Sequence, residues 1–201
     1  LVQVAVRTRE ATAQEKSRSM GFVFVLDVSG SMEADNKFVD AIDSTVAMLS
    51  ELPEGTEFGL VTFSTDARVA IPPTVVTRES REELKKKVRD LTITGGTNIE
   101  AGLVLGYKTL AELSKKNSTS RLLLLTDGMS NVGVTDPKEL AKKAGVQYLE
   151  GARISTIGLG HDVDEHLLRA IAEKGNGAYY FAESSSALKS LLMKDVASLM
   201  V

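Results

Sequence analysis

The stretch Met20-Gly-Phe-Val-Phe-Val-Leu-Asp27 decides the fold class of this chain. Its first seven residues carry no charge, which is typical of a strand covered on both faces in a mostly parallel sheet. A second run of this kind, from Arg121 to Thr126, leads into Asp127 and Gly128. The two runs predict central strands, each followed at once by a carboxylate.

Strand-like and helix-like segments alternate along the rest of the chain, between and after these two runs. The expected strands are Met20–Leu26, Glu57–Phe63, Ala67–Val76, Arg121–Thr126, Arg153–Leu159 and Ala178–Phe181, and the expected helices include Asp35–Leu52, Ser80–Leu91, Ile99–Leu113 and Ser184–Met200. This alternation predicts an α/β fold with a doubly wound, mostly parallel central sheet and helices on both faces. The polar pair Thr65-Asp66 predicts a hairpin, so that one edge strand is antiparallel.

The first residues differ from the rest. Leu1 to Arg7 alternates apolar and polar residues like a short strand, and Thr8 to Ser19 is polar without a period. We expect residues 1–19 to be an N-terminal strand and linker, with a preceding domain as one source, and residues 20–201 to form one domain. Because the chain begins at Leu1, we expect a fragment of a larger protein, whose cellular location the sequence leaves open.

Composition excludes several classes of chemistry. The 201 residues contain no cysteine and two histidines, which excludes disulfides, thiolate metal sites and multi-histidine sites. The formal charge of −3 is a poor match for nucleic acid or an anionic membrane. No apolar run approaches the roughly 20 residues of a membrane-spanning helix. A metal here must be held mainly by oxygen, which favours Mg²⁺, Mn²⁺ or Ca²⁺.

Oxygen-bearing side chains follow the expected strands at positions that suit such an ion. Asp27, Ser29 and Ser31 come directly after the first buried strand, Thr97 ends a glycine-rich loop, and Asp127 follows the second buried run. In parallel sheets, ligands bind beyond the carboxyl ends of the strands, so we expect these five donors to meet. Because only two of them are charged, a bound Mg²⁺ (Mn²⁺ and Ca²⁺ being alternatives) stays electrophilic and can accept a further carboxylate.

These residues carry a family resemblance. The run Asp27-Val-Ser-Gly-Ser-Met32, the loop Gly95-Gly-Thr-Asn98 and the turn Thr126-Asp-Gly128 resemble the metal-ion-dependent adhesion site of von Willebrand factor A domains, in wording closer to bacterial members than to integrin inserts. The resemblance covers roughly Met20 to Val201. It implies a Rossmann-like fold and a non-enzymatic module that binds a protein partner through the ion, with the partner supplying an Asp or Glu.

The resemblance also implies the role of each residue. The hydroxyls of Ser29, Ser31 and Thr97 contact the ion, and Asp27 and Asp127 act directly or through water. Integrin β-type domains place two adjacent acids shortly after the second serine; here the stretch Met32-Glu-Ala-Asp35 lacks one of them, so no second regulatory cation is expected. In the family the last helix often moves on binding.

Other interpretations remain open at this point. Asp27 suits the nucleophile of a metal-assisted phosphohydrolase, although Ser29 stands where such phosphatases, resembling the haloacid dehalogenases, carry a second acid. A subunit working beside an ATPase motor is another alternative. Thr97-Asn-Ile-Glu100 also reads as a capping box, in which the Thr97 hydroxyl only caps a helix. His161 and His166 are expected to flank a helix start rather than bind metal.

Overall fold

The computed structural model describes residues 20–113, 119–128 and 130–199. The expected strand Leu1–Arg7 and the polar segment Thr8–Ser19 lie outside these residues. None of the described helices is long and apolar enough to cross a bilayer.

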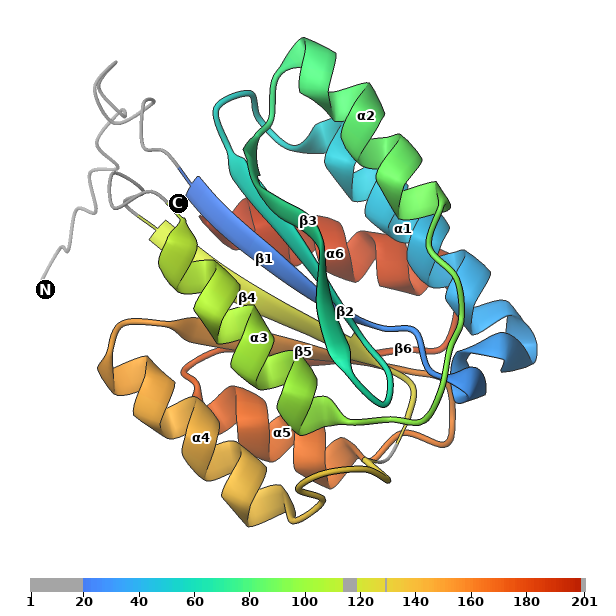
Figure 1. Cartoon of the computed structure of the whole chain (residues 1–201), viewed down its shortest axis with the longest axis vertical. Coiled ribbons are helices and arrows are strands. Elements are labelled where there is room, and N and C mark those ends of the chain that lie inside the picture. Colours follow the sequence, from blue (N-terminus) through green and yellow to red (C-terminus); the bar gives the residue numbers. More distant parts are fainter. Residues whose placement is uncertain (1–19, 114–118, 129, 200–201) are drawn as a thin grey trace, which may run out of the picture.

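Six strands form one sheet in the order β3-β2-β1-β4-β5-β6 (Figure 1). Their bounds are β1 (Met20–Asp27), β2 (Glu57–Phe63), β3 (Ala67–Val75), β4 (Thr119–Thr126), β5 (Arg153–Leu159) and β6 (Tyr179–Ala182). The pairs β1–β2, β1–β4, β4–β5 and β5–β6 are parallel, and the edge strand β3 runs antiparallel to β2. The predicted mostly parallel sheet with one antiparallel edge strand is confirmed.

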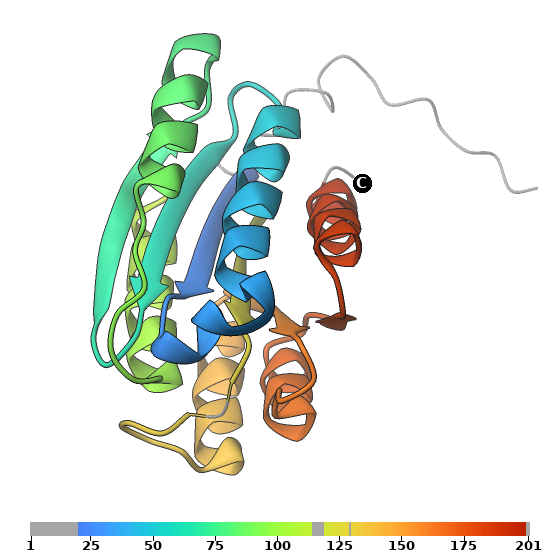
Figure 2. The same ribbon diagram turned by 90° about the vertical axis from the view of Figure 1, so that its right-hand side faces the viewer.

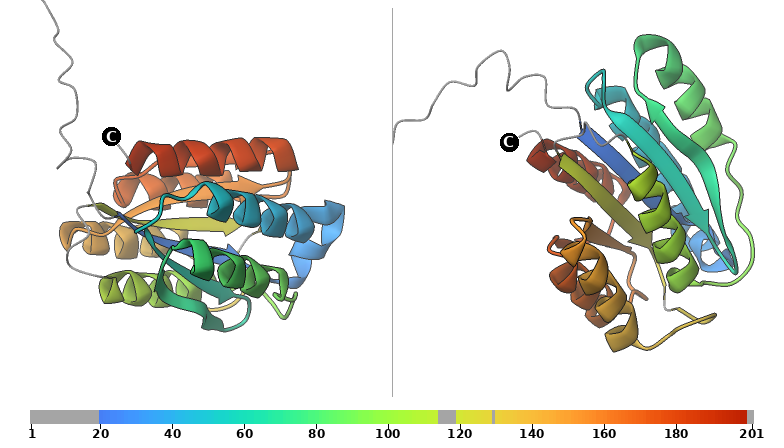
Figure 3. Two further views of the ribbon diagram at one scale, coloured as in Figure 1. Left: turned by 90° about the horizontal axis from the view of Figure 1, so that it is seen from above. Right: turned by 60° about the vertical axis from the view of Figure 1, so that its left-hand side comes forward.

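Helices cover both faces of the sheet (Figures 2 and 3). They are α1 (Lys37–Glu51), α2 (Arg78–Arg89), α3 (Ile99–Glu112), α4 (Pro137–Leu149), α5 (Glu165–Lys174) and α6 (Ser185–Leu199), preceded by the 3-10 helix η2 (Gly30–Asn36). Along β1, Phe22 and Phe24 pack with α1, α2 and α6, whereas Val23 and Val25 pack with α3, α4 and α5. Both faces of the strand are therefore buried, which explains its unbroken apolar run.

The strand order reverses between β1 and β4. From β1 the chain passes through α1 to β2 on one side, while β4 pairs on the other side and continues to β5. The loops that follow β1 and β4 therefore diverge, and the carboxyl ends of these two strands open a crevice at this switch point. Asp27 ends β1 and Asp127 directly follows β4, so the fold places both carboxylates there.

Three local predictions need correction. The helix expected from Asp35 begins at Lys37, because Asp35 and Asn36, the last two residues of η2, have left-handed φ angles of 53° and 58°. The helix expected from Ser80 begins at Arg78, because Thr77 is its N-cap and forms a capping box with Ser80. The strand β6 lies one residue later than expected.

Candidate metal centre

The loop after β1 brings its carboxylate and two hydroxyls together. Asp27 is fully buried; its Oδ1 accepts a hydrogen bond of 2.8 Å from the Ser29 amide, and its Oδ2 accepts one from the Thr126 hydroxyl. The hydroxyl oxygens of Ser29 and Ser31 lie 3.1 Å apart. The turn at Asp27 thus places the two serine hydroxyls in contact.

Asp127 connects this loop to the end of β4. Its carboxylate is 1% exposed, and its Oδ1 accepts a hydrogen bond of 2.8 Å from the Ser31 hydroxyl. Its Oδ2 accepts a hydrogen bond, also of 2.8 Å, from the ammonium of Lys37. The Asp127 side chain thus connects the loop after β1, the carboxyl end of β4 and the first turn of α1.

The glycine-rich loop before α3 is tied to both of the others. The Gly30 amide donates to the Gly95 carbonyl at 3.1 Å, which links this loop to the one after β1. The Thr97 amide donates to Asn131 Oδ1 at 2.8 Å, and the Thr97 carbonyl accepts from the Asn131 amide at 2.9 Å. The three loops that carry the predicted ligands are therefore cross-linked in pairs.

The Thr97 hydroxyl is not used as a helix cap. Asn98 caps α3, with its side chain accepting from the Ala101 amide at 3.0 Å, and Glu100 instead binds the Val134 amide and Lys143. The capping-box interpretation of Thr97 is wrong. Thr97 is 3% exposed, and its hydroxyl makes no hydrogen bond with any described residue. No other described residue therefore competes for the oxygen of Thr97.

The electrostatics of Asp27 fit a cation. The pKa of Asp27 is raised to about 6, chiefly by burial and to a small extent by the nearby charge of Asp127, while hydrogen bonds from Ser29 and Thr126 partly oppose the rise. The charged carboxylate is therefore disfavoured where it stands, and a divalent ion beside it would stabilise the charged form.

The donor set suits a hard ion that keeps an open position. Two carboxylates and three hydroxyls are offered, and hydroxyl and carboxylate oxygens are ligands that Mg²⁺, Mn²⁺ and Ca²⁺ accept. Across residues 20–113, 119–128 and 130–199, no three His, Asp or Glu side chains gather as in a carboxylate-rich site. The residues present fit a divalent cation that retains a coordination position for a further ligand.

Three residues at this centre were not singled out from the sequence. Thr126 donates a hydrogen bond to Asp27, and Asn131 accepts one from the Thr97 amide. Lys37 forms an ion pair with Asp127. One signal pointed to Lys37: it stands at the N-terminus of a helix, where the helix dipole disfavours a cation. Thr126 lies within a motif that was recognised, but nothing in its neighbourhood distinguishes its role from that of a turn residue.

The other candidates lie apart from this cluster. Glu33 and Asp35 are exposed, and no interaction between them and the five residues is present in the described chain. His161 follows β5, and His166 is the second residue of α5, whose N-terminus is capped by Asp164. Both histidines flank a helix start as predicted.

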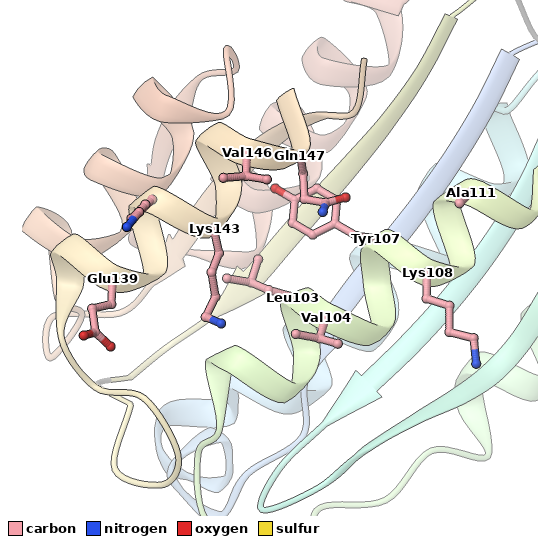
Figure 4. A pocket seen from close by; sticks show the side chains of 10 residues that line it. Leu103, Val104, Tyr107, Lys108, Ala111, Glu139, Lys143, Val146 and Gln147 are labelled. Carbon is pink, nitrogen blue, oxygen red and sulfur yellow. The ribbon is translucent and has the colours of Figure 1, made fainter. Parts of the chain in front are cut away.

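A cavity of the described residues also lies elsewhere. It is a groove of about 640 Å³ between α3 and α4, with Leu103, Tyr107 and Val146 in its lining and Lys108 and Lys143 at its edge (Figure 4). None of the five predicted ligands lines it. The candidate metal centre thus lies at the carboxyl ends of β1 and β4 and not in this groove.

Comparison with known proteins places these features in a family. A model of the von Willebrand factor type A domain matches residues 22–194. The chain is 30% identical to the uncharacterized protein YfbK of Escherichia coli (strain K12) over 202 residues, covering 100% of this chain and 35% of that protein. It is also 30% identical over 161 residues to inter-alpha-trypsin inhibitor heavy chain H1 of Sus scrofa, covering 77% of this chain and 18% of that protein. The chain thus spans about a third or less of these relatives.

Solved structures share the fold. A von Willebrand factor type A protein from Catenulispora acidiphila superposes with a TM-score of 0.81 at 24% identity, over 90% of this chain and 43% of that one. Proximal thread matrix protein 1 from the mussel byssus, in a form with a zinc-occupied metal-ion-dependent adhesion site, superposes with a TM-score of 0.71 at 23% identity, over 90% of this chain and 46% of that one. With the family model covering most of its length, this chain belongs to the von Willebrand factor type A domain family.

Proposed function

We propose that this domain binds a divalent cation, Mg²⁺ in the first place, at a complete metal-ion-dependent adhesion site of bacterial type. The ligands are Asp27, Ser29, Ser31, Thr97 and Asp127. The bound ion would take a carboxylate from a protein partner. The observation that carries this proposal is the pairwise cross-linking of the three loops, through Gly30 and Gly95, Ser31 and Asp127, and Thr97 and Asn131.

The exposure of the ligands supports an open coordination position. Ser31 is exposed to solvent, whereas Asp27, Ser29, Thr97 and Asp127 are buried. A further ligand would therefore approach the ion from the side of Ser31. Mg²⁺ commonly retains water at positions that the protein leaves open, and a carboxylate can replace such a water.

The relatives support the same function. Von Willebrand factor type A domains commonly mediate protein–protein interaction, and the mussel byssus protein holds zinc at its corresponding motif. YfbK is a bacterial relative that matches the chain along its whole length, including residues 1–19, whereas the family model begins at residue 22. We keep residues 20–201 as the proposed domain and residues 1–19 as a preceding strand and linker.

A matched pair of threonine variants tests the metal site. Thr97→Val removes a hydroxyl that makes no hydrogen bond with the described residues, so we expect the fold to persist and the affinity for Mg²⁺ and Mn²⁺ in calorimetry to fall. Thr109→Val removes a buried hydroxyl that makes no hydrogen bond with the described residues, far along α3, and should leave the affinity unchanged. Equal affinities in both variants and the original chain would show that Thr97 is not a ligand.

The partner needs a separate experiment. Capture from the native source with the immobilised chain, in Mg²⁺ and in EDTA, should yield a protein that is retained only with Mg²⁺. The Thr97→Val variant should retain much less of it. A partner retained equally in EDTA would contradict binding through the ion.

The phosphohydrolase alternative receives less support from the geometry. Both oxygens of Asp27 accept hydrogen bonds, from Ser29 and from Thr126, and the residue two positions later is Ser29, which cannot act as a general acid near neutral pH. Turnover of a phosphoester panel with Mg²⁺ that is lost in Asp27→Asn would favour the enzyme. No feature of the described residues favours a subunit beside an ATPase motor.

A further inference from the structure

Lys37 lies beside the proposed metal site although it is not one of the five predicted ligands. It is the first residue of α1, it is only 6% exposed, and its ammonium lies 2.8 Å from Asp127 Oδ2. The other oxygen of Asp127 accepts from Ser31. Asp127 is thus shared between the proposed metal site and a buried lysine.

The backbone has unusual φ angles both directly before Lys37 and at the segment that its side chain packs against. Asp35 and Asn36, the two residues before it, both have left-handed φ angles, of 53° and 58°, a conformation that costs free energy for residues other than glycine. On the opposite side, Gly160 at the end of β5 has a φ of +84°, and a Cβ there would lie 2.9 Å from Lys37 Cε. Two separate irregularities therefore accommodate one side chain.

The placement is also electrostatically costly unless the charge is needed. A lysine is rarely buried without a partner, and the N-terminus of a helix repels a positive charge. The ion pair with Asp127 offsets that cost. The Lys37 ammonium carries a positive charge, so it cannot itself bind a metal ion. It is paired with the carboxylate of Asp127, which is one of the proposed ligands.

The positive charge of Lys37 changes the net charge of the metal-loaded site. Asp27 and Asp127 supply two negative charges, which a divalent ion alone would neutralise. With Lys37 present, the loaded site keeps one net positive charge, and one incoming carboxylate cancels it. The lysine repels the metal ion but attracts an anionic ligand to it.

Building on the proposed function, we infer that Lys37 is a fixed counter-charge that sets the ligand preference of the site: it lowers the affinity for the metal ion and raises the affinity of the loaded site for a carboxylate. It is a positioning and specificity residue rather than a ligand. A purely structural lysine that only orients Asp127 would act in the opposite direction on the metal, because its loss would leave the carboxylate misplaced.

The sign of the change in metal affinity separates the two roles. We expect Lys37→Met to bind Mn²⁺ about tenfold more tightly than the original chain in calorimetry, because a like charge beside the ion is removed. Lys37→Gln, which keeps an N–H donor, should change in the same direction, and Lys37→Arg should resemble the original chain. Lys87→Met, which removes an exposed lysine that is paired with Glu83 at 2.9 Å on α2, controls for net charge. Weaker Mn²⁺ binding by both neutral variants would overturn the inference.

The anion preference is measured on the same variants with acetate as the probe. Acetate that replaces water on protein-bound Mn²⁺ lowers the relaxation enhancement of the water protons. We expect about tenfold more acetate to be needed with Lys37→Met than with the original chain or Lys87→Met, and no effect of acetamide, which is neutral. Equal acetate dependence in all of these chains would also overturn the inference.

The design also distinguishes failure of the inference from failure of the proposed function. If the original chain and Lys37→Met both bind no Mn²⁺, the metal site itself is wrong. If both bind Mn²⁺ and acetate equally, only the role of Lys37 is wrong. A Lys37→Met chain that folds in Mn²⁺ but not in EDTA, as followed by circular dichroism, would support the inference, because the ion then replaces the missing positive charge.

Discussion

At the scale of single residues, Asp27 is a proposed ligand whose ionisation the fold itself disfavours. Its carboxylate is buried, and its pKa in the metal-free protein is raised from 3.8 to about 6. The folded chain therefore holds this proton up to a higher pH than the unfolded chain does. Between these two pKa values, raising the pH ionises the unfolded chain first and so lowers the stability of the fold.

This gives a prediction for the protein in EDTA. Between pH 4.5 and 7, the Asp27 side chain should lower the free energy of unfolding by about 2 kcal/mol, out of about 3 kcal/mol for the whole shift. Urea unfolding across this range should show the loss in the original chain, and the Asp27→Asn variant should lack that part of it. Parallel pH profiles for the two chains would contradict a raised pKa at Asp27.

The sequence was enough to predict the candidate oxygen ligands but not the residues that form hydrogen bonds and ion pairs with them. Asp27, Ser29 and Ser31 are close in the chain, so their spacing alone predicts a shared turn. Lys37 and Asn131 act on Asp127 and Thr97, which are 90 and 34 positions away from them in the chain. Contacts at such separations are fixed by the crossover connections of the sheet, which residue spacing does not reveal.

At the scale of elements, α6 is held to the sheet by more than its apolar stripe. Leu188, Leu192 and Val196 are buried against the core, and between them Asp195 is fully buried as well. Asp195 Oδ1 lies 3.0 Å from Arg121 of β4 and accepts hydrogen bonds from Ser155 of β5 and Tyr180 of β6. Any displacement of α6 along the sheet must break or carry along this charged contact.

Removal of that carboxylate should be costly. Asp195→Ala removes a buried carboxylate that is paired with Arg121, whose side chain is 13% exposed, and we expect a loss of about 3–5 kcal/mol in the free energy of unfolding. Lys189→Ala, on an exposed position of the same helix, should change it by less than about 0.5 kcal/mol. The double variant Arg121→Met, Asp195→Leu should recover part of the loss. Similar unfolding curves for Asp195→Ala and Lys189→Ala would show that α6 is not anchored through this pair.

Element boundaries could be predicted where local chemistry decides them. The start of α4 is of this kind, because Asp136 caps the helix and Pro137 lies in its first turn, and both act within one turn. The start of α1 could not be predicted, since Asp35 and Asn36 adopt left-handed angles that serve the placement of Lys37. The start of α2 was predicted two residues too late, because Thr77 caps the helix and Ser80 acts as the partner of Thr77 in the capping box.

At the scale of the whole molecule, the candidate site joins parts of the fold that are far apart in the chain. Its residues follow β1, precede α3 and follow β4, and β1 and β4 are the two central strands of the sheet. The alternation of strands and helices was enough to predict this arrangement, because parallel strands place their carboxyl ends at one edge. An ion bound there would connect both central strands and a helix on one face.

Such an ion should therefore stabilise the fold globally and not only its loops. With Mg²⁺ at 100 times its dissociation constant, the native state gains about 2.7 kcal/mol over an unfolded chain that does not bind it. Amides in the middle of β1 and β4, which are buried on both faces, exchange with solvent mainly through global unfolding. We expect their hydrogen exchange to slow about 100-fold in Mg²⁺ relative to EDTA, and to be insensitive to Mg²⁺ in Thr97→Val. Slowing that is confined to residues 27–36, 92–98 and 126–134 would mean that the ion orders the loops without stabilising the sheet.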